Sequence, residues 1–180
     1  MLFRSVAWKH LLQNHPHDSI CGCSIDQAHK DMEYRFDQCM QIGSQVTAEA
    51  LRFIADRVDL PEVGPRDIAL VVFNPSTDPV NGPVDLTLRF PTELDAVFQE
   101  FFGFEPKIGF RLFDAEGKEV PYQYVSHRRN VTGFRRKRCK FPQGDMRHEV
   151  DVSCSLSIPA CGYTTVICRP AGMGEPVRYP

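Results

Sequence analysis

Apolar residues recur at steps of three and four, with a last step of five, through residues 24–58, SIDQAHKDMEYRFDQCMQIGSQVTAEALRFIADRV. The stripe consists of Ile25, Ala28, Met32, Phe36, Cys39, Gly43, Val46, Ala50, Phe53 and Val58. This spacing keeps one face of a helix apolar along its whole length. Ser24 and Gln27 have the spacing of a capping box, which predicts that the helix begins at Ser24. Residues 25–58 would then reach roughly 50 Å.

The residues before this helix predict a second, shorter helix over residues 2–12. Its apolar positions are Leu2, Val6, Trp8, Leu11 and Leu12. Pro16 disfavours helix at the residue before it, so this helix should end near Asn14, and residues 15–23 should form a loop. We expect residues 1–59 to form a long helical hairpin that is part of a helical bundle. Because the short helix cannot cover the long one, we also expect a homodimer through the long helix.

After the breaker-rich residues 60–65, the hydrophobic period changes from helix to strand. Strands are predicted over residues 68–73, 84–90, 107–113, 119–125, 150–158 and 163–168, with a hairpin turn at residues 115–117. Residues 92–102 predict either a short helix or an excursion. Short strands without long helices between them indicate an antiparallel β-sandwich over residues 66–180. The predicted fold class is therefore α+β.

Composition excludes several classes of protein. The chain has 180 residues, 42% of them hydrophobic and 24% charged, which is ordinary for a globular protein. No apolar run approaches the ~20 residues of a membrane helix, and the net charge of -2 gives no general reason to bind nucleic acid. The basic run 128–140 is interpreted as a solvated hairpin tip. Seven cysteines without an export signal predict reduced thiols and a cytoplasmic protein.

The loop between the predicted helices concentrates chemically capable side chains: His15, His17, Asp18, Cys21 and Cys23. Imidazole, carboxylate and thiolate are the usual ligands of zinc. Three interpretations stay open from the residues alone: a complete zinc site, a partial one, or no site. The spacing disfavours a complete site. Without a site, the His and Asp residues cap helix ends and the cysteines pack as small hydrophobic residues.

The segment from Trp8 to Asp26, WKHLLQNHPHDSICGCSID, resembles the zinc-dependent α-mannosidases of glycoside hydrolase family 38, in their bacterial branch. His29, Asp31 and Arg35 resemble its usual continuation. Residues 72–75 (VFNP) and 158–163 (IPACGY) look like the start and end of the first β-sandwich of that family. The resemblance implies a central fragment: part of the middle helical domain over residues 1–59, then the start of the C-terminal glycosyl hydrolase domain over residues 66–180.

The resemblance also implies roles for two residues. His17 corresponds to a ligand of the catalytic zinc, and Asp18 to a residue that contacts substrate hydroxyls near the metal. The nucleophile and the other zinc ligands are expected on a preceding barrel domain, so no catalytic residue is assigned here. The resemblance implies that the chain is part of a retaining α-mannosidase that cleaves terminal α-mannosides. The isolated 180 residues are expected to be inactive, with weak zinc binding or none.

Two alternative functions stay open. One is a mannosylglycerate-type hydrolase of the same family, whose substrate would make the basic run more relevant. The other is a non-catalytic module that binds carbohydrate or a partner chain. His29, one turn into the long helix, either lies near the zinc site or faces solvent. The residues indicate neither the linkage that is cut nor whether the substrate carries phosphate.

Overall fold

The computed structural model describes residues 2–60, 63–94, 97–99, 106–135, 141 and 143–172. The chain divides into two compact units, residues 1–59 and 60–180. The first unit is helical and the second consists of antiparallel β-sheets, so the α+β class with a long N-terminal helix is confirmed.

Three helices form the first unit: α1 (Leu2–Leu12), α2 (His17–Ile20) and α3 (Asp26–Ala55). Helix α1 has the predicted bounds. The loop predicted over residues 15–23 contains the single turn of α2, which follows Pro16 in an extended conformation (φ -52°, ψ 138°). Proline is well suited to precede or open a helix because it has no N–H to satisfy there.

The predicted capping box at the start of α3 is wrong. The residue that caps α3 is Ile25, in an extended conformation, and no side chain caps the helix. The Gln27 side chain instead donates to Asp31 Oδ1 one turn further on (3.0 Å). Side chains four residues apart face each other on a helix surface. Gln27 therefore bonds to Asp31 and does not cap the helix.

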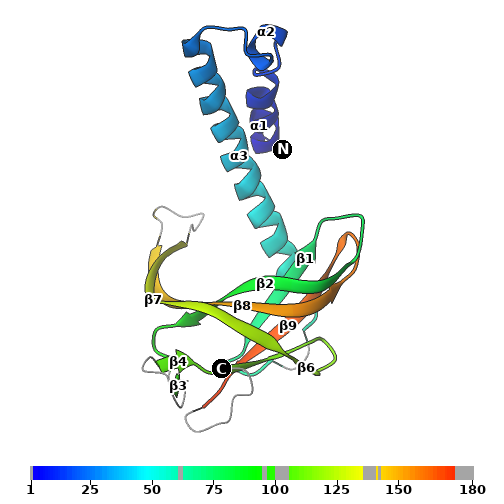
Figure 1. Cartoon of the computed structure of the whole chain (residues 1–180), viewed down its shortest axis with the longest axis vertical. Coiled ribbons are helices and arrows are strands. Elements are labelled where there is room, and N and C mark those ends of the chain that lie inside the picture. The colour runs from blue at the N-terminus through cyan, green and yellow to red at the C-terminus, as the bar shows by residue number, and fades with distance from the viewer. Residues whose placement is uncertain are drawn as a thin grey trace. The chain divides into compact units, whose positions relative to one another are not determined.

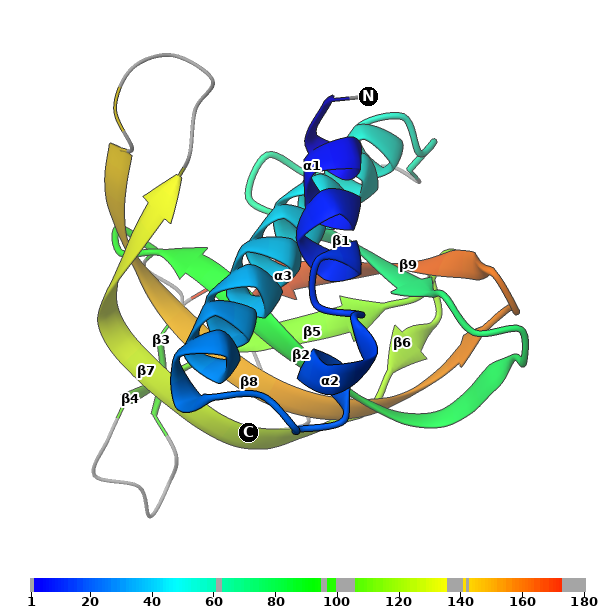
Figure 2. The same cartoon turned by 90° about the horizontal axis from the view of Figure 1, so that it is seen from above.

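Helix α1 lies beside α3, with α2 at the turn between them (Figures 1 and 2). Eleven residues extend about 16 Å and thirty about 45 Å, so α1 covers only part of α3. Within the described helices, Met32 is the one buried hydrophobic residue. Other members of the apolar stripe stay exposed, including Ile25 (76%) and Phe53 (59%).

The second unit contains nine described strands. They are β1 (Ile68–Asn74), β2 (Val80–Pro91), β3 (Val97–Gln99), β4 (Pro106–Ile108), β5 (Phe110–Phe113), β6 (Glu119–Val120), β7 (Tyr122–Arg135), β8 (Gln143–Ile158) and β9 (Gly162–Pro170). Three antiparallel sheets result, with strand orders β1-β9-β5-β6, β2-β8-β7 and β3-β4. Figure 1 shows β7, β8 and β2 crossing this unit as long neighbouring ribbons.

Several strands differ from their predicted bounds. The predicted strand 107–113 is divided at Gly109, and the predicted strand 119–125 at Pro121, where proline cannot donate to the ladder. Residues 92–94 form a turn, and residues 97–99 form β3 instead of a helix. The rest of that segment, residues 95–96 and 100–102, lies outside the described residues. The hairpin turn is confirmed, since Asp114 N donates to the Lys118 carbonyl (2.9 Å).

One hydrophobic core receives side chains from both larger sheets. Leu88, Phe90, Val150 and Val152 of the three-stranded sheet and Phe110, Leu112 and Val166 of the four-stranded sheet are fully buried. Tyr122 stacks on Phe110 with ring centroids 4.7 Å apart, and its hydroxyl donates to the Phe110 carbonyl oxygen (2.8 Å). Burial of these large side chains is the main source of stability in this unit. Among the described helices, none is long and apolar enough to cross a membrane.

Candidate functional site

The turn between α1 and α3 carries the predicted site residues. Helix α1 closes with two short-range bonds, from Asn14 N to the Leu11 carbonyl (3.0 Å) and from His15 N to the Leu12 carbonyl (3.2 Å). Pro16 then redirects the chain, and α2 begins at His17. The local sequence thus places His17 and Asp18 in the first turn of a short helix between α1 and α3.

Asn14 fixes this turn against α3. Its side chain is fully buried, and its Nδ2 donates to the Met32 carbonyl oxygen (2.9 Å). Its Oδ1 accepts a hydrogen bond from Arg35 Nη1 (3.3 Å). A buried amide is stable only when its polar atoms are paired, and here both are. From the sequence, Asn14 is expected only near the end of the first helix, and its role as a buried anchor follows from its contacts with α3.

His17 and Asp18 lie next to each other and are open to solvent. His17 Nε2 is 3.1 Å from Asp18 Oδ1, and the two side chains are 92% and 70% exposed. A protonated His17 would form an ion pair with Asp18, but such exposed pairs contribute little to stability. The two side chains are therefore accessible to a ligand and hold each other in place only weakly.

Cys21 and Cys23 complete the turn, and both are exposed. Their exposure contradicts the packing as small hydrophobic residues that the interpretation without a metal site gave them. Their backbone amides bind the carbonyls of the two predicted site residues: Cys21 N donates to His17 (3.0 Å) and Cys23 N to Asp18 (2.9 Å). Gly22 between them has φ +78°, the left-handed conformation that glycine adopts without strain.

No three His, Cys, Asp or Glu side chains in the described ranges are arranged to hold a metal ion. The described geometry therefore gives no support to a complete zinc site within these residues. His17 and Asp18 are suitable in kind, because imidazole nitrogen and carboxylate oxygen bind zinc. They are insufficient in number, because zinc sites use three or four protein ligands. Any zinc held here needs further ligands from elsewhere.

His29 does not simply face solvent. Its ring is half-buried, and its Nε2 lies 3.1 Å from the Ser24 carbonyl oxygen. This contact links the first turn of α3 to the end of the loop. His29 therefore supports the conformation of the loop from the side of α3.

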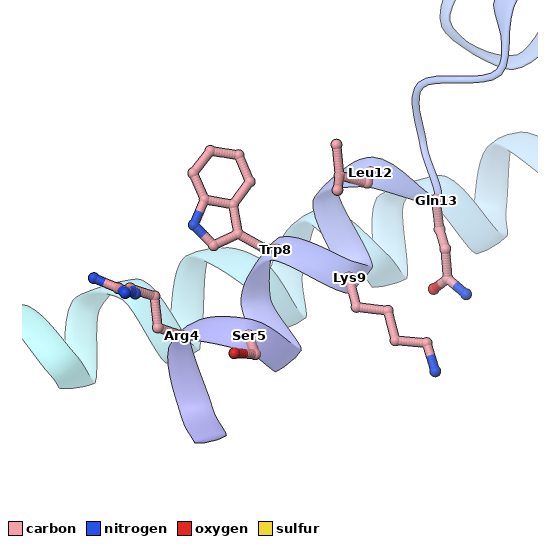
Figure 3. A pocket seen from close by; sticks show the side chains of 6 residues that line it. All are labelled: Arg4, Ser5, Trp8, Lys9, Leu12 and Gln13. Carbon is pink, nitrogen blue, oxygen red and sulfur yellow. The ribbon is translucent and has the colours of Figure 1, made fainter. Parts of the chain in front are cut away.

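Two other surface features lie outside this turn. An open hollow on α1 is lined by Arg4, Ser5, Trp8, Lys9, Leu12 and Gln13 (Figure 3). Trp8 and Leu12 extend from one side of the helix and Lys9 and Gln13 from the other, so these groups do not converge on a ligand.

The second feature is an ion-pair cluster on the β-sheet of β2, β8 and β7. The buried carboxylate of Glu149 contacts Arg89 Nε (3.3 Å), Arg147 Nε (3.0 Å) and Arg128 Nη2 (3.0 Å). Burial raises the pKa of Glu149, but the hydrogen bonds from Arg89 and Arg147 and the charges of Arg147 and Arg128 together bring it below its ordinary value. Arg128, the first residue of the basic run, is thus engaged within the sheet; residues 136–140 lie outside the described part.

The fold of this chain is similar to that of solved glycoside hydrolases. A solved structure of an α-mannosidase from Enterococcus faecalis V583 superposes on 92% of this chain with a TM-score of 0.75 and 26% identity. A second structure, of a protein in glycosyl hydrolase family 38 from Enterococcus faecalis, also matches 92%, with a TM-score of 0.71 and 26% identity. The predicted resemblance to glycoside hydrolase family 38 is confirmed.

The chain spans only a small part of these family 38 relatives, 19% and 20% of the two solved chains. A curated protein of Halalkalibacterium halodurans, named "Putative mannosylglycerate hydrolase", is 41% identical over 70 residues, which is 39% of this chain and 8% of that protein. No protein-family model matches the chain. The resemblance to family 38 therefore covers both units of this chain but only about a fifth of the solved relatives.

Proposed function

We propose that this chain acts as part of a family 38 α-mannosidase, to which it contributes His17 as one zinc ligand and Asp18 as a contact to the substrate. The observation that carries the proposal is an exposed His17-Asp18 pair, on a turn anchored by buried Asn14, in a chain that aligns over 92% of its length with an α-mannosidase. Residues 1–59 would then be part of a middle helical domain, arranged as a helical hairpin. Residues 66–180 would begin a β-sandwich domain.

The two residues have distinct chemical capacities. The His17 imidazole is nearly fully exposed and offers a nitrogen lone pair to a metal. The Asp18 carboxylate accepts hydrogen bonds and can hold two sugar hydroxyls at once. Zinc, when bound, would hold mannose hydroxyls and assist distortion of the sugar ring. Retaining glycosidases also need two carboxyl groups about 5–5.5 Å apart, and we assign both to a domain outside this chain.

The proposal predicts that the isolated 180 residues do not hydrolyse an aryl α-mannoside, because one imidazole and one carboxylate cannot complete the site. Measurable turnover by this chain alone would contradict the division of the site between domains.

The role of His17 is tested in the complete protein that contains this segment. His17→Ala should reduce α-mannosidase activity by orders of magnitude and lower the zinc content, with an unchanged circular dichroism spectrum. His15→Ala is the matched control, because His15 is also exposed and lies two residues away on the same turn. Near-normal turnover of His17→Ala would remove His17 from the site.

Mannosylglycerate hydrolysis is the second candidate activity, and the 41% identity to the Halalkalibacterium halodurans protein favours it. The two activities are separated by comparing turnover of mannosylglycerate and of an aryl α-mannoside by the complete protein. A protein that binds mannosides but cleaves neither substrate would instead support a non-catalytic module.

Two properties of the protein belong to the same proposal. A cytoplasmic location is supported by unpaired thiols, since all six cysteines in the described residues are free.

A homodimer through α3 is supported by exposed apolar side chains on that helix, among them Met40 (70%) and Phe53 (59%). A monomer by light scattering at high concentration would contradict the dimer.

A further inference from the structure

The turn that carries His17 and Asp18 also presents two exposed thiols, at Cys21 and Cys23. Cys21 and Cys23 are both exposed and unpaired, and a single glycine separates them. The Cys23 Sγ lies 3.9 Å from the Cys21 carbonyl oxygen, so the second thiol is directed back over the first residue. Two accessible thiols separated by one residue can be joined when an oxidant takes up their two electrons.

The backbone between the thiols has the freedom that ring closure requires. Two steps of 3.8 Å join the Cα atoms of Cys21 and Cys23, so these atoms lie at most ~7.6 Å apart. A disulfide needs a Cα–Cα distance of about 4.4–6.8 Å. Gly22 has a left-handed φ of +78°, which is not the extended conformation that gives the maximum separation. Nothing lies within 4 Å of the position of a Cβ on Gly22, so no packed neighbour opposes rearrangement.

The same residues are bonded to the candidate site. The amides of Cys21 and Cys23 donate to the carbonyls of His17 and Asp18, at 3.0 and 2.9 Å. These bonds close the last turn of a helix only four residues long. A change in the backbone of residues 21–23 therefore alters the hydrogen bonds that define the conformation of His17 and Asp18.

We propose that Cys21 and Cys23 are a thiol-modification site that closes reversibly into a disulfide and thereby changes the conformation of the His17-Asp18 turn. The oxidant is a low-molecular-weight disulfide such as glutathione disulfide. One cysteine thiolate attacks it and forms a mixed disulfide with release of one glutathione thiolate. The other cysteine thiolate then attacks the protein sulfur of the mixed disulfide and releases the second glutathione thiolate. The two cysteines lose two electrons in total, glutathione disulfide gains them, and the two thiol protons pass to the glutathione thiolates.

Formation of the disulfide does not depend on the proposed function; only its effect on mannoside hydrolysis does. The test therefore uses the 180-residue chain and no activity. Reduced protein is equilibrated with glutathione disulfide and glutathione, quenched with N-ethylmaleimide and digested with trypsin. Residues 10–30 then form one peptide, which contains Cys21 and Cys23 and no other cysteine.

The expected result is a 10–30 peptide that carries no maleimide and is lighter than the dithiol peptide by two hydrogen atoms. Cys21→Ser should give a mixed disulfide of glutathione at Cys23 instead. Buried Cys154 and Cys168 serve as internal controls and should stay reduced. Two maleimides or two glutathiones on the wild-type peptide would overturn the proposal.

The link to the site is tested by nuclear magnetic resonance of the His17 imidazole, assigned with His17→Ala. Its signals should shift on oxidation of the wild type and should not shift in Cys21→Ser under the same buffer. A disulfide that forms without moving the His17 signals would overturn the conformational half of the proposal. Failure of the zinc or mannosidase assays would leave both of these results unaffected.

Discussion

Asn14 is a polar residue at a fully buried position in the helical unit. Its amide joins the end of α1 to Met32 and Arg35 of α3. Asn14→Ala removes both bonds and leaves the buried partner groups without them, so we expect the helical unit to lose about 1–3 kcal/mol of unfolding free energy. The measurement is urea unfolding followed by circular dichroism at 222 nm.

Gln13→Ala is the matched control for that change, since Gln13 is the exposed neighbouring amide. If the two variants unfold at the same urea concentration, Asn14 does not hold the turn.

Glu149 makes the stability of the β-unit depend on pH. Its pKa in the folded protein lies below the ordinary value of 4.5, which holds in the unfolded chain. A lowered native pKa stabilises the fold above the unfolded value, and that contribution is lost as pH falls below 4.5 through the native pKa. Glu149→Gln removes this dependence. We therefore expect the urea midpoint of the β-unit to fall less between pH 6 and pH 3 in the variant than in the wild type.

The control for the acid experiment is Glu116→Gln, because Glu116 is exposed in the turn between β5 and β6. This variant should follow the wild-type profile. Equal acid sensitivity of wild type and Glu149→Gln would show that other groups govern acid unfolding.

At the scale of the element, two glycines of the helical unit should respond oppositely to alanine. Gly43 lies within α3, and Gly22 has a left-handed φ of +78°; neither has a neighbour within 4 Å of an added Cβ. Gly43→Ala should stabilise the unit by about 1 kcal/mol, through helix propensity. Gly22→Ala should destabilise it by about 1–2 kcal/mol, through left-handed strain. Both values come from urea unfolding at 222 nm, and a shift in the same direction for both would contradict the conformational argument.

The elements that the sequence predicts well are those in which one periodicity is strong. Steps of three and four predicted α1, and they predicted all of α3 with two residues too many at its start and three at its end. Alternation from Val150 to Ile158 predicted the second half of β8. The first half of β8 was missed because residues 143–149 contain several charged side chains and show no alternation of apolar and polar residues. Their partners Arg89 and Arg128 lie on neighbouring strands, and only the folded sheet brings these residues together.

The residue types of the candidate site could be predicted from the sequence, but the contacts that hold its turn in place could not. The residue types in the loop point to a group of candidates, and only the resemblance to family 38 singles out His17 and Asp18 among them. Their anchor depends on Asn14 and Arg35, which are 21 residues apart and meet only when α1 lies beside α3. The exposure of Cys21 and Cys23 was also not predictable, because apolar packing of a cysteine depends on neighbours that the loop does not have.

At the scale of the whole molecule, the two units have very different cores. The helical unit buries Met32 and Asn14 among its described residues, whereas the β-unit buries a cluster of thirteen hydrophobic residues. A 59-residue unit with so little buried apolar surface is marginally stable. The β-unit has both a larger core and paired strands, so its free energy of unfolding should be higher.

We therefore expect two unfolding transitions in urea, with the helical unit unfolding first. Each unit has its own probe: Trp8 is the only tryptophan of the chain and lies in the helical unit, and Tyr122 stacked on Phe110 gives near-ultraviolet dichroism in the β-unit. Fluorescence of Trp8 should change at lower urea than the tyrosine signal. Gly43→Ala should move only the first transition, and Glu149→Gln at pH 6 only the second, because each acts within one unit. Coincident transitions that both variants shift together would mean that the units unfold as one cooperative structure.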